Sequence, residues 1–148
     1  MAKFRFELES LLKARRLAEQ ASQRALAAIE QERMRLEETL RLLQRQISDG
    51  KHSMQGSLVG RVEADHLRMH AASTMHTMRK AQRIVLEMAG VHRRLDAARA
   101  ALIESARQRR AVEILRERRF EQWKAHQEKL ETDALDELAV IAAARPKT

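Results

Sequence analysis

The feature that most constrains this chain is the near absence of glycine and proline from two long stretches of periodic sequence. Residues 4–47 contain neither residue, and residues 61–143 contain a single glycine, Gly90. Since glycine and proline are the residues that most often interrupt regular elements, the chain has the means to make very few turns. The sequence therefore predicts a few long elements rather than a compact fold of many short ones.

Apolar residues in both stretches recur at steps of three, four and seven, which places them on one side of an α-helix. The stripe in the first stretch consists of Leu26, Ile29, Leu36, Leu40, Leu43 and Ile47, extended towards the N-terminus by Leu8, Leu11, Leu12, Ala18, Ala21 and Ala25. A heptad frame in the second stretch falls on Leu67, Thr74, Ala81, Met88, Leu95 and Leu102, with partner positions Ala71, Met78, Val85, His92 and Arg99. Two helices with such stripes bury them against each other as a coiled coil.

The break between the two stretches carries three of the four glycines, Gly50, Gly56 and Gly60. We expect a first helix over about residues 4–47, a connecting segment over about 48–60 and a second helix over about 61–143. Residues 1–148 then form a single hairpin. The predicted fold class is all-α: a long two-helix antiparallel coiled coil with an overhanging C-terminal helix.

The two predicted helices are unequal in length, roughly 65 Å and roughly 120 Å at the rise of an α-helix. A bend near Met54 leaves the second helix without a partner from about Glu104 onward. Phe120 and Trp123, the largest apolar side chains of that helix, would then be exposed to water. Large exposed aromatic side chains at a helix end indicate a binding partner.

The composition agrees with long helices, because charged residues make up 34% of the chain and aromatic residues only 3%. The formal net charge is +8, so acidic partners should be attracted to the protein. Cysteine is absent, and no run of apolar residues approaches the roughly 18 that a membrane-spanning helix requires. We expect a soluble protein without disulfides, with the cytoplasm as its default location.

The sequence offers no residues for catalysis or for a cofactor. His66 and His70 lie four residues apart beside Glu63 and Asp65, but a third converging ligand is missing, so we interpret them as surface or seam histidines rather than metal ligands. Phosphate-binding loops, nucleophile elbows and paired carboxylates in an apolar setting do not occur. We therefore predict a non-enzymatic protein without metal or cofactor.

The densest basic run precedes the aromatic pair and consists of Arg107, Arg109, Arg110, Arg116, Arg118 and Arg119. Arginines that lead into aromatic residues could bind nucleic acid, since arginine neutralises phosphate and aromatic rings stack on bases. Glutamates at 104, 113, 117 and 121 interrupt the run, which is typical of the solvated face of a coiled coil. We favour that interpretation over nucleic-acid binding.

Four parts of the chain together resemble one protein family. They are the opening Lys3-Phe4-Arg5-Phe6-Glu7-Leu8-Glu9-Ser10-Leu11-Leu12-Lys13, the glycine-bearing middle, the basic helix from Arg109-Arg110 to Arg118-Arg119, and the closing Leu135-Asp136-Glu137-Leu138-Ala139. In this combination the chain resembles the FliJ family of flagellar export proteins over essentially its whole length.

The resemblance implies a stalk component of the bacterial flagellar type III protein export apparatus. Members of the family form an antiparallel helical hairpin similar to the central stalk of rotary ATPases. They are cytoplasmic, sit in the pore of the hexameric export ATPase, contact the cytoplasmic domain of the export gate at the membrane and bind export chaperones. The resemblance thus implies these three partners and a peripheral position at the cytoplasmic side of the cell membrane.

On this basis we expect the overhanging end of the hairpin, opposite the turn, to engage the ATPase ring. The residues predicted to do so are Phe4, Phe6, Arg116, Arg119, Phe120 and Trp123. A smaller patch of Leu67, Met69 and Met75 is predicted to contact the export gate. Met69 and Met75 lie outside the heptad positions of the seam, so their side chains are expected to point outward.

Three alternatives stay open at this point. The stalk protein of a virulence type III secretion system has the same architecture. A basic nucleic-acid-binding coiled coil would show steep salt dependence in DNA binding. A self-associating structural rod would reveal itself by its mass in solution.

Overall fold

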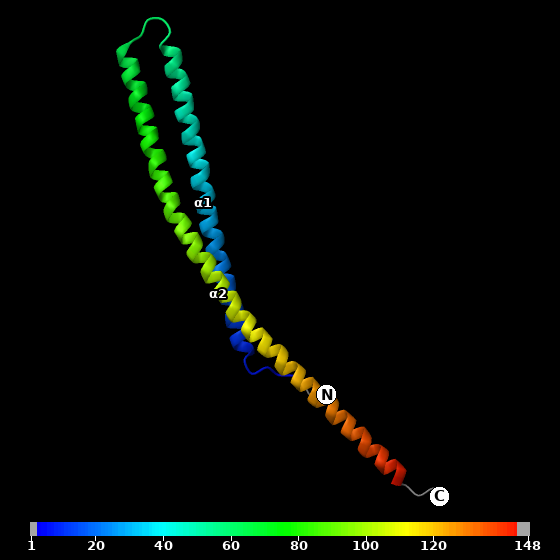
Figure 1. Ribbon diagram of the computed structural model, residues 1–148. Helices are drawn as coiled ribbons and strands as arrows, with labels where there is room; N and C mark the ends of the chain where they lie inside the picture. Colours follow the sequence, from blue (N-terminus) through cyan, green and yellow to red (C-terminus); the bar gives the residue numbers. More distant parts are fainter. Residues whose placement is uncertain (1–2, 145–148) are drawn as a thin grey trace. The chain divides into compact units, whose positions relative to one another are not determined.

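The structure, a computed structural model, describes residues 3–144. Two helices, α1 (Glu9–Ser57) and α2 (Ala64–Ala144), account for nearly all of this part, and no strand occurs within it. The helices pack against each other in opposite directions (Figure 1). The prediction of an all-α helical hairpin is confirmed.

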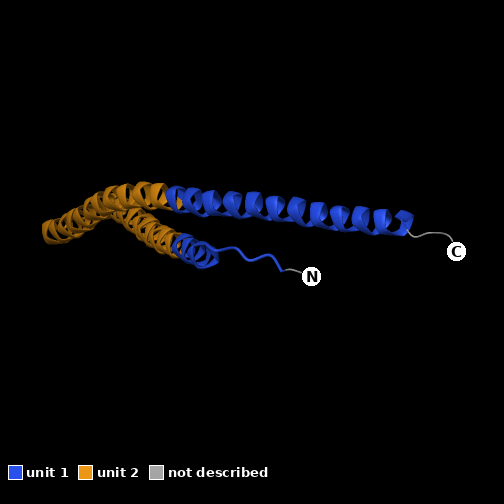
Figure 2. Cartoon of the chain, turned by 90° about the horizontal axis from the view of Figure 1, so that it is seen from below, with its two compact units in different colours: residues 1–20, 103–148 blue, residues 21–102 orange. Residues whose placement is uncertain are grey.

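The chain divides into two compact units, each containing a segment of both helices (Figure 2). The hairpin unit consists of residues 21–102 and includes the turn between the helices. The terminal unit consists of residues 1–20 and 103–148 and includes both ends of the chain.

The seam of the hairpin unit is apolar, and the stripe predicted for residues 26–47 of α1 lies in it, with Leu43 buried and the other members half-buried. The heptad frame of α2 from Leu67 to Leu102 also faces α1, as predicted. The partner positions, however, lie one residue earlier than predicted, at His70, Thr77, Ile84, Val91 and Ala98. A step of three from each frame residue brings the β-branched Ile84 and Val91 into the seam, whereas a step of four would have brought in the polar His92.

The turn is shorter than predicted, because α1 continues through much of the segment assigned to the connection and ends at Ser57. Only residues 58–63 lie between the helices. A glycine inside a helix costs about 1 kcal/mol, which packing can offset. A Cβ at Gly50 would lie 3.4 Å from Oγ1 of Thr74, an ordinary van der Waals contact, so packing does not require a glycine there. Among residues 3–144, Gly60 alone has a positive φ, 100°, a conformation that favours glycine.

The later turn changes which residues face each other. Within the hairpin unit, Nη1 of Arg94 lies 2.9 Å from Oε2 of Glu32. Within the terminal unit, Nε of Arg116 lies 3.2 Å from Oε2 of Glu9. The prediction that α2 is unpaired from Glu104 onward is therefore wrong. For each residue by which the turn lies later in the sequence, the α2 partner of a given α1 residue lies two positions further along α2. The unpaired part of α2 is the C-terminal extension, residues 124–144, where almost every side chain is exposed.

Across residues 3–144, no helix contains a stretch sufficiently long and apolar to cross a membrane.

Candidate functional site

Three aromatic rings meet in the terminal unit and form what we call the aromatic cluster, Phe4, Phe120 and Trp123. The centroid of the Phe4 ring lies 5.3 Å from that of Phe120 in an edge-to-face arrangement and 5.8 Å from that of Trp123. The Phe120 and Trp123 rings are stacked, with their centroids 5.9 Å apart. These separations fall in the range in which aromatic pairs attract each other.

Phe4 reaches α2 from a non-helical segment that precedes α1, the N-terminal strap of residues 3–8. In the strap Phe4 and Phe6 are half-buried, whereas Lys3 and Arg5 are exposed. This alternation is expected of an extended chain, in which successive side chains point to opposite sides. The backbone N–H of Glu9 then donates a hydrogen bond to the carbonyl of Phe6, 3.2 Å away, and the helix begins.

The aromatic cluster contradicts the expectation that the end of α2 leaves Phe120 and Trp123 bare. Phe120 keeps 42% of its surface exposed and Trp123 is half-buried, because the chain's own strap covers part of both. The predicted first helix from residue 4 would have carried Phe4 along α1 instead. The exposed surface of the aromatic cluster is therefore made jointly by the strap and α2.

A cavity of about 330 Å³ adjoins the cluster and is lined by both strap and α2 residues, among them Phe6, Leu115, Arg119 and Trp123. Arg119 makes no ion pair with any described residue, so its guanidinium is available to a partner. Arg116, by contrast, is engaged by Glu9. All six residues predicted to bind the ATPase ring thus lie in the terminal unit, but Arg116 already has an ionic partner.

Next to the cluster the seam becomes ionic. Arg109 binds Glu19 of α1 through Nε, and its Nη1 lies 2.6 Å from Oε2 of Glu113. Arg16 of α1 reaches the other oxygen of Glu113 at 3.3 Å. We call these four residues, with the hydrogen-bonded Arg15 and Gln108, the polar seam.

The polar seam shifts the pKa values of its own members. Partial desolvation raises the pKa of the Glu113 carboxyl, but hydrogen bonds from Arg109 and Arg16 outweigh it and hold the pKa below its usual value. Hydrogen bonds to Glu19 and then Glu113 raise the pKa of Arg109. Glu113 and Arg109 are therefore both charged at neutral pH.

The sequence interpretation missed the polar seam because it followed small apolar residues. Ala18, Ala21 and Ala25 were expected to face α2, yet all three are exposed. Counting heptad steps back from Leu26 gives 22, 19, 15 and 12, and these positions do face α2. The signal was the spacing rather than the hydrophobicity.

The polar seam and its neighbours also account for part of the basic run on α2. Arg109, Arg110 and Arg116 are all bound to glutamates, with Nη1 of Arg110 lying 2.9 Å from Oε1 of Glu117. Paired arginines are less available to phosphate groups. This supports the interpretation of the run as a coiled-coil face.

The patch predicted for the export gate is only partly on the surface. Met69 and Met75 are exposed, at 69% and 54%, but Leu67 is half-buried in the seam. Nearby, Nε2 of His66 lies 3.7 Å from a carboxylate oxygen of Glu63. Over residues 3–144 no group of three potential ligands is placed to hold a metal ion.

Comparison with known proteins bears on the whole chain. Neither the curated proteins nor the solved structures give a match. The family described as Flagellar FliJ protein matches residues 4–148, which include both helices, the strap from Phe4 onward and the aromatic cluster. The chain belongs to the FliJ family of flagellar proteins.

Proposed function

We propose that this protein is the non-catalytic stalk of the flagellar export ATPase, and that the aromatic cluster with Arg119 binds the ATPase ring. Membership of the FliJ family makes the chain a component of the flagellar protein export apparatus. The observation that carries the finer proposal is a half-exposed aromatic cluster beside an unpaired arginine in the terminal unit.

The chemistry of the cluster suits a protein interface. Aromatic residues and arginine contribute most of the binding energy in many interfaces, because they fill well-packed pockets from which water is excluded. The strap holds Phe4 against both aromatic side chains of α2, so part of the surface is organised before a partner arrives. Pre-organisation lowers the entropy lost on binding.

The remaining parts of the proposal concern the other partners. The exposed Met69 and Met75 are proposed to contact the cytoplasmic domain of the export gate, and the protein is proposed to escort export chaperones. The protein would then work in the cytoplasm, peripheral to the membrane through the gate alone. Methionine side chains adapt to different partner surfaces, which suits a transient contact.

The test combines Phe120→Ala with Trp123→Ala in the full chain and measures both co-elution with the purified hexameric export ATPase and stimulation of ATP hydrolysis. Loss of two interface anchors should weaken binding at least about tenfold. The matched control replaces two exposed apolar residues of the hairpin unit, Met34→Ala with Leu42→Ala. Unchanged ATPase binding by a helical aromatic-cluster variant would contradict the proposal.

Binding to the gate is tested separately. Met69→Glu with Met75→Glu should reduce capture of the gate's cytoplasmic domain while leaving ATPase stimulation intact. Equal capture by the variant and the unaltered chain would remove the gate assignment from this patch.

A further inference from the structure

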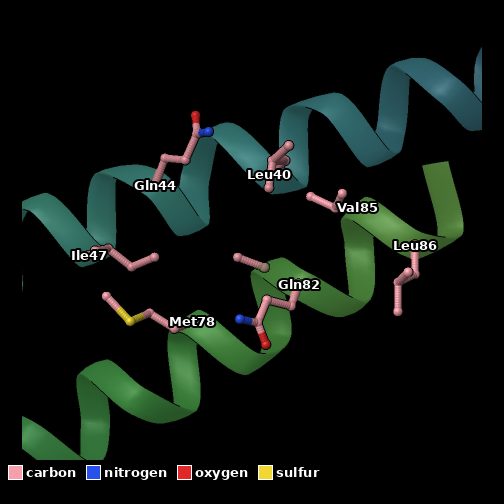
Figure 3. A pocket seen from close by; sticks show the side chains of 8 residues that line it. Leu40, Gln44, Ile47, Met78, Gln82, Val85 and Leu86 are labelled. Atoms are coloured by element: carbon pink, nitrogen blue, oxygen red, sulfur yellow. The ribbon is translucent and has the colours of Figure 1, made fainter. Parts of the chain in front are cut away.

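The hairpin unit contains an apolar groove where the two helices separate slightly. Leu40 and Ile47 of α1 face Met78 and Val85 of α2 across a gap, with Leu86 at its outer edge (Figure 3). The gap has a volume of about 650 Å³. Val85 is 52% exposed and Leu86 74%, so the groove presents apolar surface to solvent over about two helical turns.

The rim of the groove is basic. Arg41 lies three residues before the lining residue Gln44, and Arg79 and Arg83 lie seven and three residues before Leu86, so these three side chains border the groove. Residues 40–47 and 78–86 contain no acidic residue. All three arginines are exposed, and none forms an ion pair with a described residue. Arg16 and Arg109 of the polar seam, by contrast, are held by glutamates. An apolar floor with unpaired cations around it fits a helix that is apolar on one face and acidic beside it.

The C-terminal extension has this chemistry. Its exposed apolar residues include Leu130, Leu138 and Ile141, which lie on one side of the helix at steps of eight and three. Acidic residues accompany them: Glu131, Asp133, Asp136 and Glu137 are exposed and form no ion pair within the described chain. The extension is therefore a helix with an unpartnered apolar stripe and unneutralised carboxylates.

We propose that the C-terminal extension of one copy of this protein docks into the apolar groove of a second copy. Leucine and isoleucine side chains fill the groove, and the carboxylates of the extension meet the arginines of the rim. The contact joins two different surfaces, so each docked molecule still offers one free groove and one free extension, and copies add in succession. Two turns of helix bury less than the roughly 1,200 Å² of a stable interface, so the association is weak. The inference does not depend on the proposed function.

The first measurement is the mass of the full chain by sedimentation at rising concentration. At low salt the average mass should increase over about 10–300 µM, the range expected of a weak interface. Raising the ionic strength to about 0.5 M should reverse the increase, because salt screens exposed charges. A constant monomer mass over the whole range overturns the proposal.

Charge reversal then identifies the two surfaces. Arg79→Glu with Arg83→Glu breaks the groove, and Asp136→Lys with Glu137→Lys breaks the extension; each variant alone should remain monomeric. All four side chains are exposed, so the fold is retained, as circular dichroism will verify. The matched control, Arg24→Glu with Arg93→Glu, changes the net charge by the same amount away from the groove and should still associate.

Two combinations separate this contact from other modes of association. A mixture of the groove variant and the extension variant pairs the intact groove with the intact extension and the reversed groove with the reversed extension, so the mixture should associate although each variant alone stays monomeric. A chain carrying all four reversals should regain association, since the charges are exchanged rather than lost. Dimerisation of the groove variant by itself, or failure of the exchanged chain to associate, overturns the assignment.

Discussion

The hairpin unit and the terminal unit join the same two helices by different means. In the hairpin unit the seam is apolar, with Leu43, Val91 and Leu95 buried. In the terminal unit Leu12 is buried, but the next seam positions of α1 are Arg15 and Glu19. Apolar burial is largely insensitive to salt and pH. Exposed and half-exposed ion pairs, in contrast, are weakened by added salt and by acid that protonates their carboxylates.

The polar seam contributes less stability than an apolar seam would, but it specifies how the two helices are aligned. Apolar heptads tolerate several registers, while a charged residue in a seam is satisfied in only one. Glu19 and Glu113 meet arginines of the opposite helix only when the helices are aligned as observed. We infer that the hairpin unit supplies most of the stability, and that the polar seam fixes the alignment that brings the strap to Phe120 and Trp123.

The largest expected effect comes from removing a side chain of the apolar seam. Leu95 is 1% exposed, so Leu95→Ala should lower the free energy of unfolding by about 2–5 kcal/mol. Leu86→Ala, at an exposed position of the same helix, should change it by less than about 0.5 kcal/mol. Urea denaturation measures both, and equal losses would contradict an apolar seam at Val91 and Leu95.

A smaller and local effect is expected in the polar seam. Arg109→Ala leaves Glu19 and Glu113 without their shared partner, and we expect a smaller loss of stability than for Leu95→Ala because these groups remain partly solvated. Hydrogen exchange should accelerate over residues 9–20 and stay unchanged over 26–47. Acceleration spread evenly over both units would mean that they open together.

The strap can be followed through the only tryptophan of the chain. Phe4→Ala removes the ring that contacts Trp123, which should shift the fluorescence emission of Trp123 to longer wavelength and cost about 1 kcal/mol. Arg5→Ala, at an exposed neighbouring position, serves as the control. An unshifted emission in the Phe4 variant would show that the strap does not cover Trp123 in solution.

The smallest effect should be the pH dependence of the terminal unit. The pKa of Glu113 lies below its usual value of 4.5, so its ion pairs add stability above that pH and lose it as the pH falls through the lowered value. The hydrogen-exchange protection factors of residues 9–20, which correct for the intrinsic pH dependence of exchange, should therefore fall in acid. Glu113→Gln should remove part of this acid response, and an identical response in the variant would assign it to other carboxyls.

The sequence was sufficient for those features that depend on local pattern. The stripe from Leu26 to Ile47 and the frame from Leu67 to Leu102 follow from helical spacing, which each helix carries by itself. The register was not predictable in this way, because it depends on how far α1 continues, and Gly50 and Gly56 proved compatible with a helix. Only Gly60 has the positive φ that a turn requires.

The candidate site was predicted as a set of residues but not as an arrangement. Phe4, Phe120 and Trp123 were all identified, since large aromatic residues are rare in this chain. Their mutual contact depends on the register and on a strap that is not helical, and neither has a signal in heptad spacing. For the same reason the sequence suggested an exposed tip, where the structure has one partly covered by its own chain.

The contact between Phe4 and Trp123 has a practical consequence for the way the protein is handled. An affinity tag joined just before the strap would sit beside the proposed ATPase-binding surface and could obstruct it. A label inserted in the turn between the helices, next to Val59, which is 85% exposed, lies in the hairpin unit instead. Exposed turns are the positions where insertions are best tolerated. Capture experiments with this protein should therefore attach it to beads through the turn.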